Sequence, residues 1–178
     1  MGKISAALLA TFALALSACA SQKAADFEGR GPAFVLEDYF EGETLAYGVF
    51  EGRGGHLRRT FKVEIDGTWD GETLVLDEDF FYDDGETDKR VWSFRKTGPN
   101  TYVGTAGDVV GEARIESYGS AVNLKYLVDL KVGDGTVRVR FDDWLYRLED
   151  DIVINRAFVR KFGARVGEVS LVFVKPDA

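Results

Sequence analysis

The chain has 178 residues, a formal net charge of −8, and 46% hydrophobic and 13% aromatic residues. This hydrophobic content excludes general disorder, and the length fits one domain of about 150 residues. The acidic balance argues against nucleic-acid binding, which needs Lys and Arg to displace counterions, and equally against polybasic docking on anionic lipid.

Residues 1–18 are predicted to be an export signal. Lys3 supplies a positive start, and Ile4–Leu16 is an apolar run. A run of about 13 residues fits the core of a signal peptide and is too short to span a bilayer. It ends in the four residues LSAC, with Cys19 last. This pattern resembles the lipobox of bacterial lipoproteins, in which the Cys is acylated and becomes the first residue.

Cys19 is the only cysteine of the chain, so no intramolecular disulfide can form. Several acyl chains on Cys19, each buried CH₂ contributing about 0.8 kcal/mol, would hold the protein permanently on a membrane. The next residue, Ala20, is not Asp, which by resemblance to the sorting rule of diderm bacteria favours the outer membrane. We therefore expect an anchor in the inner leaflet of the outer membrane, facing the periplasm. An ordinary secretory signal, or an uncleaved segment, is the alternative.

Residues 19–33 are small and polar after the cysteine and predict a flexible tether. Residues 34–178 are predicted to form one β-barrel domain. Its first segment, Phe34–Phe40, is short and apolar, and fits either a first strand or a turn of helix that plugs one end.

The remaining sequence alternates apolar and polar residues with a period of two. The alternation includes Leu45, Tyr47 and Val49 on one face, then Phe61, Val63 and Ile65 in the next run. Such alternation is typical of strands with one buried and one wet face, and Gly and Asp pairs separate the runs as tight hairpins require. About nine or ten strands with short connections predict an all-β fold, a single antiparallel up-and-down barrel or strongly coiled meander of lipocalin-like character.

The most unusual segment is Thr73–Lys96, which predicts two strands joined by the acidic turn 83–86. The acids around this turn suggest calcium, because hard cations prefer oxygen ligands. However, Phe80 would occupy the first ligand position of an EF-hand loop, so a solvated acidic turn is the preferred interpretation. We expect no metal site and no cofactor.

Known catalytic patterns are missing from the sequence. The single histidine, His56, follows two glycines in a predicted turn, which disfavours a Ser-His-Asp site. With one His and a lipidated Cys, a zinc site of nitrogen and sulfur ligands cannot be assembled.

Several charged residues instead lie in phase with apolar residues of their strands. These are Arg59, Glu78, Arg90, Asp143 and Arg156, with the aromatic residues Trp92 and Tyr126 beside them. Charges that point into a barrel must pair or meet water or a ligand, because uncompensated burial is costly. One interpretation is a pocket that holds a polar or anionic group beneath an apolar lining. The other is a structural ion-pair network, or an error in the predicted register at a bulge.

Four motifs carry a family resemblance. DEDFFYDDGETDKRVW (77–92), FDDW (141–144) and INRA (154–157), together with the LSAC motif, resemble a family of bacterial lipoproteins catalogued as a domain of unknown function. The resemblance covers almost the whole mature chain and implies no reaction. The triplet Gly67-Thr68-Trp69 also resembles the Gly-x-Trp motif of lipocalin-type barrels, although at least one strand precedes it here.

Two hypotheses follow. The first is a non-catalytic, membrane-anchored barrel that binds a small amphipathic or hydrophobic ligand. The second is a structural or interaction lipoprotein of the envelope whose barrel is filled. An enzyme that uses Glu78 or Asp143 as general acid or base is a third possibility.

Overall fold

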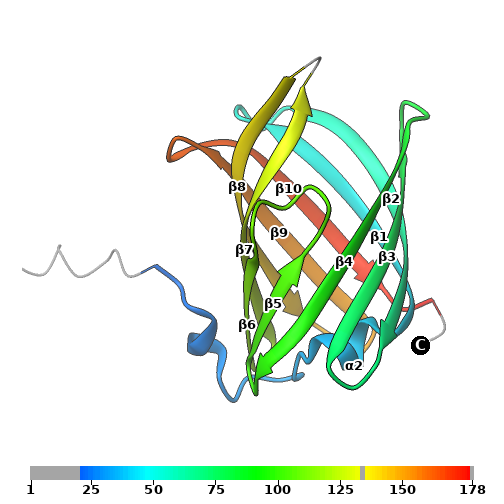
Figure 1. Cartoon of the computed structure of the whole chain (residues 1–178), viewed down its shortest axis with the longest axis vertical. Coiled ribbons are helices and arrows are strands. Elements are labelled where there is room, and N and C mark those ends of the chain that lie inside the picture. The colour runs from blue at the N-terminus through cyan, green and yellow to red at the C-terminus, as the bar shows by residue number, and fades with distance from the viewer. Residues whose placement is uncertain (1–20, 133–134, 177–178) are drawn as a thin grey trace, which may run out of the picture.

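The structure, a computed structural model, describes residues 21–132 and 135–176, and these form a closed barrel of ten antiparallel strands (Figure 1). The strands are β1 (Gly42–Gly52), β2 (Leu57–Trp69), β3 (Thr73–Tyr82), β4 (Thr87–Gly98), β5 (Thr101–Thr105), β6 (Ala113–Tyr118), β7 (Ala121–Val132), β8 (Gly135–Arg147), β9 (Ile152–Lys161) and β10 (Ala164–Val174). The predicted all-β barrel is confirmed, as are the two strands and turn predicted over Thr73–Lys96.

Each strand pairs with its neighbours in sequence, and β1 pairs with β10 to close the sheet. Closure removes the exposed edges that an open sheet would present to other chains. β5 and β6 are the shortest strands, and the loop between them bonds to β7 instead: the Val110 N–H donates to Leu127 O at 2.8 Å.

The inward faces of β2, β3 and β4 are those that the alternation predicts. Val63, Leu76 and Trp92, for example, are buried in one continuous core. In β1 the predicted face of Leu45, Tyr47 and Val49 is the outer one, and the small residue Ala46 points inward. The ring of Phe61 fills the space inside β1, because a Cβ on Gly48 would lie 2.6 Å from it. The inward face of β1 therefore has room only for small residues at this point.

One end of the barrel is plugged by the short helix α2 (Leu36–Phe40), so the helical alternative for this segment is the correct one (Figure 1). Its buried Glu37 accepts hydrogen bonds from Lys96 Nζ and, at 2.6 Å, from the Tyr102 hydroxyl. Burial opposes ionisation of this carboxyl, but the two hydrogen bonds outweigh it and lower its pKa. No helix among the described residues is long and apolar enough to cross a bilayer.

The segment before α2 packs against the outside of the barrel. The 3₁₀ helix η2 (Ala24–Phe27) buries Ala24, and the ring of Phe27 lies 6.2 Å from that of Trp144 on β8. This part of the predicted tether is therefore ordered, because it shields aromatic residues on the outer face of β8 from water. Barrel, plug and core are all formed within residues 21–176, whereas the predicted signal and Cys19 lie outside the described residues.

The plug depends on Gly67, because a Cβ there would lie 1.8 Å from the carbonyl oxygen of Phe40 in α2. We predict that Gly67→Ala lowers the free energy of unfolding by about 3 kcal/mol through overpacking, measured by urea denaturation. Gly107→Ala is the control, since a Cβ at Gly107 meets no atom within 4 Å. Equal stability of the two variants would contradict the close contact.

Candidate functional site

A cavity of about 380 Å³ occupies the barrel interior above the plug. Most of its wall is apolar, made by side chains of nearly every long strand. The aromatic residues that line it are Phe40, Phe50, Phe61, Phe80, Tyr82, Trp92, Phe94, Tyr126, Phe141 and Phe173. A more open hollow of about 580 Å³ lies on the outer wall over Gly48, but the charged residues of the interior are not part of it.

Arg90 on β4 supplies the positive charge of the cavity wall. Its guanidinium lies 4.4 Å from the ring centroid of Trp92 and 5.7 Å from that of Tyr126. Its Nη2 is 3.2 Å from Oδ1 of Asp108, in the loop between β5 and β6. Yet Nε and Nη2 are buried and donate no hydrogen bond to any described residue. Arg90 is thus held by aromatic rings and by the ion pair of Nη2 with Asp108, while the Nε and Nη2 edge of its guanidinium makes no hydrogen bond within the described chain.

Asp143 on β8 is the second charged group of the wall. Its Oδ2 accepts a hydrogen bond from the Tyr126 hydroxyl at 3.0 Å, while its Oδ1 is buried without a partner in the described chain. Burial raises the pKa of the Asp143 carboxyl to about 7, although Tyr126 and Arg90 act in the opposite direction. Burial likewise raises the pKa of Tyr126 well above its ordinary value.

Glu78 on β3 stands directly opposite Arg90 in the strand register. Neither a hydrogen bond nor an ion pair joins Glu78 to another residue of the described chain. Burial raises its pKa to about 7, and the nearby Arg90 lowers it only in part. The structure therefore brings Glu78, Arg90, Asp143 and Tyr126 to one cavity, as the strand phases indicate.

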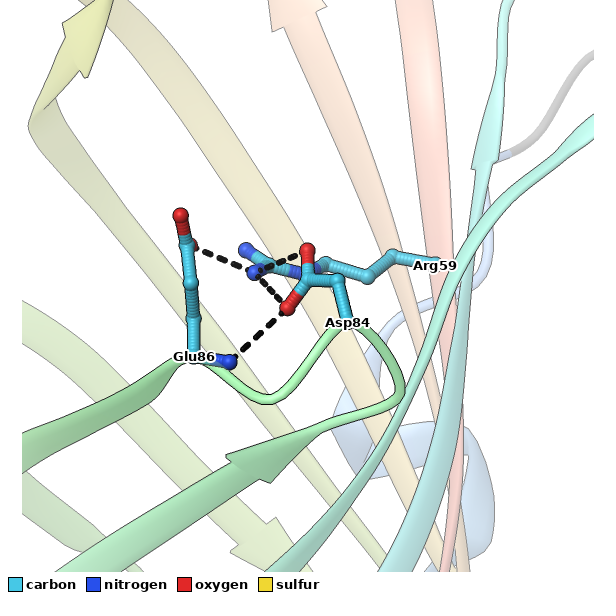
Figure 2. A network of polar contacts seen from close by, with 3 residues as sticks. All are labelled: Arg59, Asp84 and Glu86. Carbon is cyan, nitrogen blue, oxygen red and sulfur yellow. Dashed lines mark hydrogen bonds and ion pairs between the residues drawn. The ribbon is translucent and has the colours of Figure 1, made fainter.

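Arg59 also lines the cavity, but its charge is already compensated. Figure 2 shows its guanidinium between two carboxylates of the β3–β4 turn: Nη2 lies 2.5 Å from Asp84 Oδ2 and 2.5 Å from Glu86 Oε2. The guanidinium also lies 3.7 Å from the ring centroid of Tyr82. The acidic turn, interpreted from sequence as solvated, thus holds Arg59 at the open end of the barrel.

Arg156 does not belong to this group, and its predicted inward orientation is wrong. Its side chain is 54% exposed on the outer face of β9, where it pairs with Glu168 of β10. The inward residue is Asn155, which lines the cavity. The error arose because β9 carries apolar residues on both faces, with Ile154 outside and Val153 inside.

Asp108 and Asn155 were missed by sequence reasoning. Asp108 lies in a loop that bonds to β7 (the Asp129 N–H donates to Asp108 O at 3.1 Å), a long-range contact with no local signal. Asn155 could have been found from its small inward neighbour Ala157, because small residues often mark the crowded inner face of a barrel.

The chain matches the family described as "Protein of unknown function (DUF3833)" over residues 13–175 and belongs to that family. The predicted family resemblance is confirmed to that extent, whereas the lipoprotein character stays a prediction. No match is found among curated proteins.

Solved structures share the barrel. The S-type phycobiliprotein lyase CPES from Guillardia theta has a TM-score of 0.58 and 11% identity, covering 88% of this chain and 99% of that one. The redesigned β-barrel mFAP1 bound to DFHBI has a TM-score of 0.41 and 8% identity, covering 78% and 97%. At these identities the likeness concerns the fold.

The raised pKa of Asp143 makes stability depend on pH. The unfolded carboxyl titrates near pH 3.9 and the folded one near 7, so the folded protein holds an extra proton between these values. The free energy of unfolding should therefore fall as pH rises from about 4 to about 7. Asp143→Asn keeps an acceptor for Tyr126, and we expect it to be about 2 kcal/mol more stable than wild type at pH 8.

Urea denaturation at pH 5 and pH 8 measures this slope. The outward-facing Asp142→Asn variant serves as control and should retain the wild-type slope. An Asp143→Asn protein with an unchanged slope would show that this carboxyl is not the buried titrating group.

Proposed function

We propose that this member of the DUF3833 family is a non-catalytic binding protein whose barrel holds a small amphipathic molecule with one anionic group. The observation that carries the proposal is that Arg90 lines a mostly apolar cavity while its buried Nε and Nη2 donate no hydrogen bond to the described chain, although Nη2 lies in an ion pair with Asp108. In this arrangement the apolar part of the ligand packs among the aromatic rings, and its anionic group lies against the guanidinium.

The energetics favour an occupied site. A buried donor without a partner costs about 1–3 kcal/mol, and more where the group is charged. Nε and Nη2 together form the side of a guanidinium that binds a carboxylate or phosphate through two parallel hydrogen bonds. A ligand anion at this edge would accept hydrogen bonds from both donors, taking the place of the 3.2 Å ion pair between Nη2 and the half-exposed Asp108.

The two carboxyl groups fit the same arrangement. With pKa values of about 7, Glu78 and Asp143 are partly protonated at neutral pH and can then donate hydrogen bonds. A ligand anion would repel their ionised forms, so binding should take up protons and weaken as pH rises above 7. The unpaired Oδ1 of Asp143 is a further polar contact for a ligand headgroup.

The cavity volume bears on the filled-barrel alternative. At about 380 Å³ the cavity lies near the lower end of the roughly 300–1,000 Å³ typical of small-molecule sites. A barrel with a purely structural interior would be expected to fill this space and to pair its buried polar atoms, as close packing and hydrogen bonding require.

Calorimetric titration with decanoate and with decanol tests the proposal, because the two differ only in the headgroup. We predict that wild type binds decanoate at least about tenfold more tightly, the value of one charge-assisted hydrogen bond. Arg90→Gln should abolish this preference, but it should still bind both compounds through the packing of their alkyl chains.

Arg95→Gln is the matched control, since Arg95 is exposed on the outer face of the same strand. It should bind both compounds as wild type does. Failure of wild type to bind either compound, or an unchanged preference in Arg90→Gln, would overturn the proposed headgroup site.

We also propose that Cys19 carries a lipid anchor that places the barrel on the periplasmic side of a bacterial outer membrane. The LSAC motif and the apolar run before it support this. We predict that cells fed an alkyne-tagged fatty acid label the wild-type protein and not Cys19→Ser, detected by gel fluorescence and intact mass. Ser17→Ala keeps the motif small and should label normally, whereas equal labelling of Cys19→Ser would rule out this anchor.

A further inference from the structure

The tip of the β9–β10 hairpin breaks two rules of stable turns. Phe162 is 98% exposed, the most exposed of the large apolar residues described. It also has a φ of 50°, in the left-handed region that Gly and Asn favour and bulky residues avoid. The next residue, Gly163, fits this geometry at a φ of 82°. The turn therefore holds a strained phenylalanine in water, where it contributes nothing to the barrel core.

Three arginines stand side by side next to this tip. In the strand register Arg160 of β9 lies opposite Arg140 of β8 on one side and Arg165 of β10 on the other. Like charges directly across a sheet destabilise it. Arg165 pairs with the buried Glu168, but neither Arg140 nor Arg160 forms an ion pair with any residue that the structure describes. We call Arg140, Arg160, Lys161, Phe162 and Arg165 the cationic rim.

The β1–β2 turn extends the cationic rim. The pairing of Gly52 with Gly167 brings this turn beside the β9–β10 hairpin. Arg53 in the turn and Arg58 at the start of β2 are exposed, and Leu57, the first residue of β2, is 59% exposed. The open end of the barrel thus carries exposed apolar residues beside cations at two neighbouring hairpins, on a protein whose net charge is −8.

We propose that the cationic rim docks on an anionic lipid surface, with Phe162 inserted among the headgroups. An apolar residue surrounded by cations is the composition that binds such an interface, where each Lys or Arg adds electrostatic attraction and the ring leaves water. The net charge of the whole chain does not reveal that cations gather at this end of the barrel. The exposed Phe162 and the adjacent arginines destabilise the barrel, and binding to an anionic lipid surface explains why they are present.

The orientation of the chain agrees with this surface. In Figure 1 the β9–β10 hairpin (orange) and the start of the described chain at residue 21 (blue) project to the same side of the barrel. A lipid on Cys19 would therefore bring the cationic rim toward the membrane. The docking surface does not depend on a ligand in the barrel, and its test needs none.

Vesicle co-sedimentation of the chain from Ser21 to Ala178, which contains the whole barrel, tests the proposal. We expect binding to vesicles of phosphatidylcholine and phosphatidylglycerol in equal parts, and not to pure phosphatidylcholine. The binding should weaken as salt shortens the Debye length from about 10 Å at 0.1 M to about 3 Å at 1 M. Phe162→Asn and the double variant Arg140→Gln/Arg160→Gln should each bind about tenfold more weakly.

Phe162→Asn separates binding from folding, because Asn tolerates the left-handed conformation. Its thermal midpoint should equal or exceed that of wild type while its vesicle binding falls. Leu148→Asn, at the opposite end of the barrel, and Arg95→Gln, on the outer face of β4, should bind like wild type. Failure of wild type to bind the anionic vesicles, or wild-type binding by the rim variants, would overturn the proposal.

Discussion

The pairing of β1 with β10 is the constraint on which the rest of the structure depends, because it converts a sheet into an enclosed interior. Inside a closed barrel a charged side chain has little water to solvate it, so it must pair, change its protonation state or meet a ligand. The cavity uses each of these solutions. Arg59 pairs with Asp84 and Glu86 at the open end, and the carboxyls of Glu78 and Asp143 have raised pKa values. Nε and Nη2 of Arg90 make no hydrogen bond within the described chain, and we propose that a ligand meets them.

The two ends of the barrel interior differ in how their polar groups are satisfied. At the plug, Glu37 accepts hydrogen bonds from Lys96 and Tyr102, and the Ser117 hydroxyl donates to the carbonyl of Phe34. Higher up, buried atoms of Arg59, Arg90 and Asp143 have no hydrogen-bond partner in the described chain, although Nη2 of Arg90 forms an ion pair with Asp108. A fold that satisfies its polar groups at one end is capable of doing so at the other, and we therefore interpret the unpaired atoms as the polar side of a binding site.

Much of the fold could be predicted from the sequence, because alternation and turn residues are local signals. The hairpin of β3 and β4, with Glu78 and Arg90 on the inward faces of their strands, follows from strand phase and the turn residues, whereas their position opposite each other comes from the register. The orientation of β1 and β9 could not be predicted in this way, since both strands carry apolar residues on both faces. In β1 the space available at Gly48, beside the ring of Phe61, decides the orientation.

Contacts between distant segments were equally out of reach. The approach of Asp108 to Arg90 depends on a loop that bonds to β7, and the row of Arg140, Arg160 and Arg165 exists only in the register of three strands. Neither contact can be seen in the composition, and the net charge of −8 argued against nucleic-acid binding and against polybasic docking on anionic lipid. Charge averaged over a chain therefore says little about one face of a barrel.

The central claim is that Arg90 holds an anionic amphipathic molecule inside the barrel. Native mass spectrometry of the protein purified from its own host, released without denaturation, tests it most directly. We expect a co-purified small molecule with an acidic group that dissociates on activation in the gas phase and is missing from Arg90→Gln. A wild-type protein that carries no bound molecule, or an Arg90→Gln variant that carries the same molecule at equal occupancy, would contradict it.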